Sequence, residues 1–198
     1  TPSGHPMADL DQPLRFSAMV PLQVYNTLQI AAERERLCRT DILIIGGGAI
    51  DAGLEAEIRQ LPGEVYSTYG MTETLSHIAL RRLNGPDAST LYYPFPSVRL
   101  SLSPEHTLII DAPLVCDTIL VTNDVAEINS DGSFSILGRK DNTINTGGIK
   151  VQAEQVEDIL RPWIHVPFAI TSVSDAALGE AVVLLIESGG YTERLEEK

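Results

Sequence analysis

The chain has 198 residues, 43% of them hydrophobic, and a formal net charge of −13 at pH 7. This length can bury a core and suits one or two domains. The negative charge argues against nucleic-acid binding, which depends on basic surfaces, but not against a small anion held by backbone N–H groups and a few cations. Without an apolar run near the ~20 residues that span a bilayer, or a signal peptide, a cytoplasmic protein is expected. The two cysteines fit a reducing compartment and are expected to pack as small hydrophobes.

The first 93 residues alternate between extended and helical patterns. Residues 15–37 predict a strand and then one helix beginning at Pro21, and "DILIIGGG" (41–48) predicts a buried strand that runs into glycines. A helix capped by Asp51 is expected over 49–61, and a strand over 63–70. Strand, turn, helix and strand in this order predict a parallel α/β sheet.

From about residue 94 the pattern changes to short alternating runs. The runs lie at 97–111, 117–128 and 132–138, and turn residues separate them. This pattern predicts an antiparallel β module. Near the end of the chain, two further strands are expected at 167–175 and 180–188.

Between these two groups of strands, residues 152–163 predict an amphipathic helix that ends at Arg161, before Pro162. Its inward side chains are expected to be Val156, Ile159 and Leu160. Trp163 is expected in the core. The final "YTERLEEK" predicts the beginning of another helix.

One stretch, "STYGMTETLSHIAL" (67–80), places a glycine, two threonines and a glutamate directly after a predicted strand. The plain interpretation is the start of a helix with Thr72 or Thr74 as its N-cap. The functional interpretation is that the hydroxyls and the carboxylate face a ligand. Both remain open on these residues alone.

Polar or glycine-rich loops follow three predicted strands, and ligands of open α/β sheets bind at the carboxyl ends of strands. The loops are Gly46-Gly47-Gly48, Tyr69 to Glu73, and Asn123-Asp124. The plain alternatives are a tight turn for the glycines and an ordinary turn residue for Asp124. Arg139, which follows the predicted strand at 132–138, has the plain alternative of a surface cation. Together they favour a ligand site.

Four motifs in order resemble the core of the adenylate-forming superfamily, which includes acyl-CoA synthetases, peptide-synthetase adenylation domains and luciferase. They are "GGGAI" (46–50), "YGMTET" (69–74), "TND" (122–124) and "GRKDNTINTGGIKV" (138–151). The resemblance runs from about residue 15 to 188. Within the superfamily, "MVPLQV" (19–24), residues 69–85 and residues 138–157 are most similar to o-succinylbenzoate–CoA ligases of menaquinone biosynthesis.

The resemblance implies an α/β fold. Residues 1–140 would form the C-terminal part of the large adenylation domain, with a parallel α/β part (1–93) and a small antiparallel β-barrel module (94–140). A hinge and part of a mobile α+β domain would follow at 141–198. The family's Ser/Thr/Gly-rich phosphate loop and its late lysine have no counterpart here, so we expect a fragment that is inactive alone.

The implied activity is an ATP-dependent ligase, which joins a carboxylate to AMP and then to CoA. ATP, CoA and a small carboxylate would be its partners and Mg²⁺ its metal, with no nucleic acid and no membrane span; a homodimer is left open. Rival interpretations are another aryl- or fatty-acyl-CoA synthetase, or a non-catalytic adenylate-binding module on the same fold.

The resemblance also implies roles for individual residues. Thr72 and Glu73 would be catalytic, with Glu73 holding Mg²⁺. Asp141 would be the hinge, and a CoA/thioester loop would contain Gly147, Gly148 and Lys150. The nucleotide would be bound by Gly46, Gly47, Gly48, Ala49, Tyr69, Gly70, Met71, Thr72, Asp124 and Arg139.

Some positions keep a structural alternative. His77 would line an acyl pocket or be a hydrogen-bonded structural histidine, and Lys150 is equally an exposed structural lysine. Arg81 and Arg82 would counter a dicarboxylate substrate or lie at a helix end. Asn123 stands where the family pattern has glycine, and asparagine tolerates left-handed backbone better than most residues.

Overall fold

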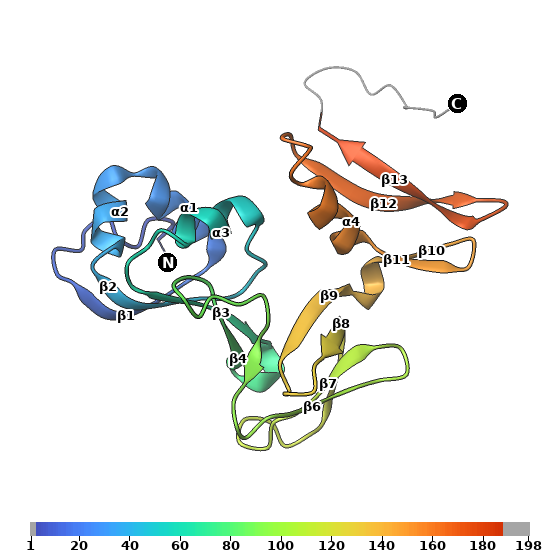
Figure 1. The fold of residues 1–198 in the computed structure, drawn as a ribbon, viewed down its shortest axis with the longest axis horizontal. Coiled ribbons are helices and arrows are strands. Elements are labelled where there is room, and N and C mark those ends of the chain that lie inside the picture. The colour runs from blue at the N-terminus through green and yellow to red at the C-terminus, as the bar shows by residue number, and fades with distance from the viewer. Residues whose placement is uncertain (1–2, 188–198) are drawn as a thin grey trace. The chain divides into compact units, whose positions relative to one another are not determined.

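The computed structural model describes residues 3–187, which divide into two compact units (Figure 1). Unit 1 holds the described residues of Thr1–Ser101 together with Ile109–Leu120 and Ile128–Ser135. Unit 2 holds Leu102–Leu108, Val121–Glu127 and the described residues of Ile136–Lys198. The two units are treated separately below. The predicted domain boundary at Asp141 stays a prediction.

Unit 1 contains a five-stranded sheet with the strand order β1-β2-β3-β4-β5. The first three strands are parallel, which confirms the predicted parallel sheet: β1 (Leu14–Met19), β2 (Thr40–Ile45) and β3 (Glu64–Gly70). The last two are antiparallel: β4 (His77–Arg82) and β5 (Tyr93–Pro94). The plain interpretation of the Thr-Glu-Thr stretch, the start of a longer helix, is wrong, because a short loop there leads the chain back along β3 as β4.

Three helices belong to unit 1: α1 (Pro21–Gln29), α2 (Ala31–Leu37) and α3 (Ala52–Ile58). The single helix expected after Pro21 is broken at Ile30, whose backbone is extended (φ −111°, ψ 114°). The Asp51 cap is confirmed, since its carboxylate accepts from the Gly53 and Leu54 N–H groups at 2.9 and 3.1 Å. The helices bury their apolar stripes against the sheet, in a core that includes Val24, Leu28, Leu43, Ile45, Leu54, Ile58, Leu61 and Val65.

The buried Asn84 joins the segment before β3 to the segment after β4. Its Oδ1 accepts from the Val65 N–H at 3.0 Å, and its Nδ2 donates to the carbonyl oxygens of Leu61 and Gly63 at 2.8 and 2.7 Å. The Arg82 Nε also donates to Oδ1, at 3.2 Å. Asn84 thus satisfies backbone groups that no strand or helix pairs.

We predict that Asn84→Ala lowers the free energy of unfolding by about 2–4 kcal/mol, because buried backbone groups lose their partners. Asn26→Ala is the control, since the Asn26 Nδ2 donates to the Gly4 carbonyl oxygen in an exposed bond. The control should cost about 1 kcal/mol or less. Urea titration followed by circular dichroism measures both. Equal losses in the two variants would contradict the role of Asn84.

The antiparallel module is a four-stranded sheet with the order β6-β7-β8-β9. Its strands are β6 (Arg99–Leu102), β7 (Thr107–Asp111), β8 (Leu120–Ile128) and β9 (Phe134–Arg139). They coincide with the short alternating runs, and the turn residues predicted between those runs lie between the strands.

Unit 2 has a second four-stranded sheet, with the order β11-β10-β13-β12 and antiparallel pairing. Its elements follow the single-turn helix η2 (Lys140–Asn142): β10 (Thr143–Thr146), β11 (Ile149–Gln152), α4 (Ala153–Leu160), β12 (Phe168–Asp175) and β13 (Gly179–Ile186). Helix α4 ends where predicted, with Arg161 as its C-cap. The helix expected at the end of the chain lies outside the described residues.

A small core holds α4 to this sheet. It contains Ile144, Ala153 and Ile170, and the partly buried Val151, Val156 and Leu160 pack against it. Two predicted core residues are exposed instead: Ile159 (70%) and Trp163 (80%). Val156 and Leu160 form a stripe at a spacing of four residues, and Ile159 lies beside that stripe rather than on it.

Each cysteine is half-buried. Cys38 packs against the unit 1 core, as expected, whereas the Cys116 thiol donates to the Thr118 carbonyl oxygen at 3.3 Å. Within residues 3–187, no helix is both long enough and apolar enough to cross a membrane.

Candidate functional site

A cleft of about 540 Å³ opens in unit 1 at the carboxyl ends of β1, β2 and β3. Its walls come from the last residues of these strands and from the loops that follow them. The lining residues are Ala18, Met19, Val20, Gln23, Ile44, Gly46, Gly47, Thr68, Gly70, Met71, Thr72, Leu75, Ser76 and His77. The cleft therefore lies where an open α/β sheet binds ligands.

The loop after β2 needs glycine for steric reasons. The Gly46 N–H donates to the Met19 carbonyl oxygen at 3.1 Å, and a Cβ on Gly46 would lie 2.3 Å from the Thr68 Oγ1. Gly47 has φ +81°, a conformation that side chains disfavour. The glycines thus bring bare backbone to the cleft wall, which a ligand can approach closely.

The Thr-Glu-Thr turn is a short 3₁₀ helix, η1 (Thr72–Thr74), whose N-cap is Met71. Neither Thr72 nor Thr74 is the N-cap, which corrects the plain interpretation. The buried Thr74 hydroxyl instead accepts from the Met71 N–H at 3.0 Å and lies 2.8 Å from the Ser76 carbonyl oxygen. Thr72 and Glu73 are exposed, so their polar groups are available to a ligand.

A tight γ-turn follows η1 and forms part of the cleft wall. The Ser76 N–H donates to the Thr74 carbonyl oxygen at 2.7 Å, with Leu75 between them at φ 62°. Gly70 makes room for this turn, because a Cβ there would lie 2.1 Å from the Ser76 carbonyl oxygen. The Leu75 side chain is 80% exposed at the cleft as a result.

His77 also lines the cleft, where its Nδ1 lies 3.0 Å from the Ser76 hydroxyl and its ring centroid 5.6 Å from that of Phe95. These contacts fix the ring, so the structural interpretation of His77 and its place on the wall are compatible. Its proposed acyl contact stays a prediction.

We predict that Thr74→Val lowers the free energy of unfolding by about 2–3 kcal/mol, because the Met71 N–H and the Ser76 carbonyl oxygen lose a buried partner. Thr74→Ser keeps the hydroxyl, loses only a methyl group, and should cost about 1 kcal/mol. Chemical denaturation of both variants measures the difference. A valine variant as stable as the serine variant would contradict this account of the turn.

The cleft gathers six of the predicted site residues and leaves others out of its lining. It includes Gly46, Gly47, Gly70, Met71, Thr72 and His77. The predicted residues Gly48, Ala49, Tyr69 and Glu73 are not among the described lining residues. The Tyr69 ring lies in an aromatic cluster with Tyr92 and Phe134, at centroid distances of 5.9 and 5.3 Å.

Sequence reasoning missed the wall formed by the end of β1. Met19, Val20 and Gln23 lie there, whereas residues 19–24 are predicted only to begin a helix and to resemble the ligases, not to line a cleft. The same rule that identified the loops after β2 and β3 applies to β1, because β1 pairs in parallel with β2. The signal was therefore present in the sequence.

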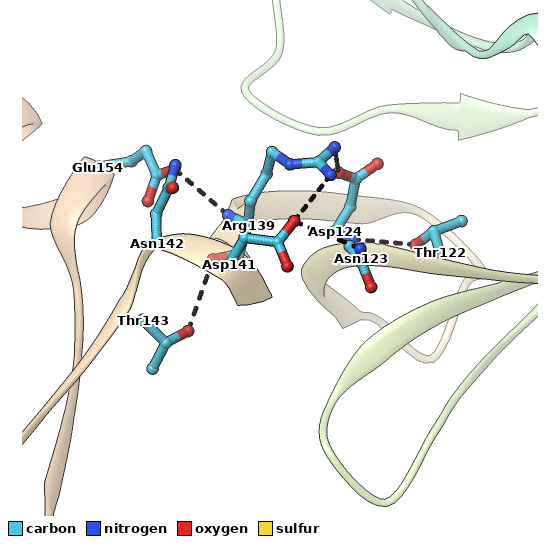
Figure 2. A network of polar contacts seen from close by, with 8 residues as sticks. All are labelled: Thr122, Asn123, Asp124, Arg139, Asp141, Asn142, Thr143 and Glu154. Carbon is cyan, nitrogen blue, oxygen red and sulfur yellow. Dashed lines mark hydrogen bonds and ion pairs between the residues drawn. The ribbon is translucent and has the colours of Figure 1, made fainter.

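In unit 2, Arg139 at the end of β9 bridges two carboxylates (Figure 2). Its Nη1 lies 3.4 Å from the Asp124 Oδ1, and its Nη2 lies 3.1 Å from the Asp141 Oδ2. The hydrogen bond with Asp141, followed by the charge of Asp124, raises the pKa of Arg139 above its usual value. Asp124 and Arg139, predicted as nucleotide contacts, and Asp141, predicted as the hinge, thus form one charged network.

The segment after β9 is held by side chains of α4 and of the turn between β6 and β7. The Asn142 Nδ2 donates to the Glu154 Oε1, which also accepts from the Arg139 N–H at 3.4 Å (Figure 2). The Lys140 ammonium pairs with Glu105, and this pair holds the pKa of the Glu105 carboxyl below its usual range. These partners order the single turn of η2.

The predicted thioester loop is the turn of the β10–β11 hairpin. Gly147 and Gly148 form its two central residues, with φ +57° and +82°. Positive φ at both positions is the type I′ pattern, which favours glycine. Lys150 is exposed on β11, opposite Asn145.

Arg81 and Arg82 lie on strand β4 rather than at a helix end, which corrects that part of the sequence analysis. Arg81 pairs with Glu55 at 2.9 Å and Arg82 with Glu64 at 3.2 Å. The hydrogen bond from the Tyr66 hydroxyl, with Arg82, lowers the pKa of Glu64. Both arginines thus have carboxylate partners within unit 1, so neither is an uncompensated cation for a dicarboxylate.

A metal site made only of protein side chains is absent from the described part of the chain. No group of three or more His, Cys, Asp or Glu residues within 3–187 is arranged to hold a metal ion. A Mg²⁺ ion bound by one carboxylate and substrate phosphates does not need such a group.

The chain is similar over most of its length to AMP-forming ligases. It is 24% identical over 172 residues to the 2-succinylbenzoate–CoA ligase of Lactococcus lactis, covering 78% of this chain and 38% of the relative. It is 29% identical over 198 residues to the "Probable 2-succinylbenzoate--CoA ligase" of Mycobacterium tuberculosis, covering 88% and 48%. No protein-family model matches. The chain spans less than half the length of these two relatives.

A solved structure shows the same fold at higher identity. The acyl-CoA synthetase (AMP-forming)/AMP-acid ligase II-like protein of Dyadobacter fermentans has a TM-score of 0.68 and 35% identity, with coverage of 96% of this chain and 56% of that one. The relatives and this neighbour are acyl-CoA ligases of the AMP-forming type, which confirms the predicted resemblance to the adenylate-forming superfamily and the predicted fold class. Among them are 2-succinylbenzoate–CoA ligases, as the finer resemblance predicts.

Proposed function

We propose that this chain is part of an ATP-dependent acid–CoA ligase and carries much of its nucleotide site. The observation that carries the proposal is the cleft of unit 1, where the ends of β2 and β3 bring together residues of two motifs that resemble those of AMP-forming ligases: Gly46, Gly47, Gly70, Met71 and Thr72. Similarity to such ligases over most of the chain supports it.

In this proposal the cleft holds the phosphates and part of the acyl group. The exposed Thr72 hydroxyl donates to a phosphate oxygen, and the backbone of Gly46 and Gly47 lies against the ligand. The exposed Glu73 carboxylate holds Mg²⁺, because this hard ion prefers carboxylate and phosphate oxygens. Tyr69, half-buried near the end of β3 and outside the cleft lining, offers a flat face for adenine.

The resemblance assigns the ribose contacts and the moving parts to residues from 124 onward. Asp124 accepts hydrogen bonds from the ribose hydroxyls, since an ionised carboxylate is an acceptor only. Arg139 holds ribose or phosphate oxygen with a permanent positive charge. Asp141 is the hinge, and the Gly147-Gly148 turn with Lys150 approaches the nucleotide in the second step.

The reaction has two steps. A carboxylate oxygen of the substrate attacks the α-phosphorus of ATP, and the bond to the bridging oxygen of pyrophosphate breaks, which gives acyl-AMP. The CoA thiolate then attacks the acyl carbonyl carbon, and AMP leaves with the electron pair of the carbon–oxygen bond. The chain's groups hold the phosphates and the sugar so that these atoms are aligned.

We propose o-succinylbenzoate as the acyl substrate, because two related ligases with that name align over most of the chain. Pyrophosphate release by the complete encoded protein tests this against a panel of aryl, fatty and dicarboxylic acids. We expect o-succinylbenzoate to give the highest kcat/KM. Release with another aryl or fatty acid alone would place the enzyme elsewhere in the superfamily, and release with none would favour a non-catalytic adenylate-binding module.

We predict that Glu73→Gln in the complete protein lowers the rate of pyrophosphate release by about 100-fold or more, because a metal ion contributes several kcal/mol to stabilising phosphoryl charge. The matched control is Glu35→Gln, on the exposed face of α2, which should leave the rate unchanged. Since Glu73 is exposed, both variants should unfold at the wild-type temperature. An unchanged rate in the Glu73 variant would remove its metal role.

A further inference from the structure

Asn123 departs from the family pattern, which has glycine between the threonine and the aspartate. Glycine has no side chain, whereas Asn123 carries an amide that donates from its Nδ2 to the Asp141 Oδ2 at 3.3 Å. Strand β8, which carries the proposed ribose carboxylate Asp124, therefore also contacts the proposed hinge residue directly (Figure 2).

A second contact joins β8 to the end of β9 beside it. Asn123 binds Asp141, and the neighbouring Asp124 pairs with Arg139 at 3.4 Å. Arg139 and Asp141 are in turn joined at 3.1 Å, so the four side chains form a continuous chain of contacts (Figure 2). Two consecutive residues of β8 thus hold Asp141 of η2 and Arg139, the N-cap of η2.

The contact between Arg139 and Asp141 can break and re-form at low cost. The side chains of Asp141 and Arg139 are 57% and 53% exposed, and exposed polar pairs contribute little individually because water competes for both partners. A deeply buried pair would instead lock the segment. The Asn123 contact therefore biases the position of Asp141 without preventing its rotation.

We propose that Asn123 is a positioning residue that couples the ribose site to the hinge by holding Asp141 against the strand that carries Asp124. The inference rests on the proposed roles of Asp124 and Asp141. When the ribose hydroxyls engage Asp124, they restrain β8 at this point, and Asn123 transmits that restraint to Asp141. A glycine at position 123 cannot do so, which makes the coupling a property of this chain.

A double-mutant cycle with Asn123→Ala and Asp141→Ala tests the contact. The reporter is the Thr143 amide, whose N–H donates to the Lys140 carbonyl oxygen at the end of η2 and exchanges with solvent when this turn opens. Hydrogen exchange of the segment 140–143 is followed by mass spectrometry. We expect each single variant to accelerate exchange by about two- to fivefold, as the loss of an exposed contact allows.

The double variant decides whether the two residues act together. If Asn123 acts through Asp141, the double variant should exchange no faster than Asp141→Ala alone. Asn129→Ala is the matched control, because Asn129 binds the Ser133 hydroxyl in the turn after β8 and should add independently to Asp141→Ala. Additive effects of Asn123→Ala and Asp141→Ala, or no effect of Asn123→Ala, would overturn the proposal.

A second arm adds ATP with Mg²⁺ to the complete protein and measures the same segment. We expect ATP to slow its exchange in the wild type and to slow it at least twofold less in Asn123→Ala, whereas Asn129→Ala should respond like the wild type. Equal protection in all three would overturn the coupling. The proposed function fails separately, if pyrophosphate release is absent while the cycle and the ATP response behave as expected.

Discussion

The hydrogen bonding of three parallel strands in register is the constraint on which the candidate site depends. Met19 lies opposite Ile45, and Ile45 lies opposite Ser67, so the carboxyl ends of β1, β2 and β3 are level. A shift of one residue in either pairing would turn every side chain of a strand to the other face. The loops that follow these strands can form one cleft only because the register keeps their first residues together.

The loops themselves are shaped by hydrogen bonds from a few buried polar side chains. Thr74 supports the wall after β3, and Asn84 supports the segment that leads into β3. Such buried groups are costly unless they are fully paired, so they select one backbone path. In unit 2 the ion pair between Arg139 and Asp141 is exposed to solvent instead of buried. The chain thus has a fixed wall in one unit and weakly held, reversible contacts in the other.

Periodicity and turn chemistry were sufficient to predict most of the elements. The parallel strands, the Asp51 cap, the end of α4 and the alternating runs of the β module are all found. Local patterns failed where a tertiary contact decides the backbone. The γ-turn at Leu75 needs the space at Gly70, five residues earlier, and the residue pattern of 67–80 does not show that need, so a helix start stayed open as the plain interpretation.

The motifs predicted which loops would form the cleft but not which side chains would face it. Six predicted residues line it, whereas Tyr69 packs in an aromatic cluster because the alternation of β3 directs its ring there. The wall at Met19 and Gln23 was not predicted, because glycine and hydroxyl motifs mark only the loops after β2 and β3, and residues 19–23 carry no such motif. Pairing of arginines with carboxylates, as for Arg81, cannot be read from charge counts at all.

The environment of Asn84 also affects the chemical stability of its side-chain amide. Asn84 precedes Gly85, and an asparagine–glycine pair is the dipeptide in which the following backbone nitrogen most readily attacks the side-chain carbonyl carbon. Ammonia leaves and a succinimide forms, which water then opens to aspartate or isoaspartate. Here the amide is buried and donates to two carbonyl oxygens, so the folded chain holds it away from that cyclisation. Deamidation would set a carboxylate against those same oxygens. The bonds that build this turn therefore protect its chemistry, and storage damage at this position should begin in molecules that have already unfolded.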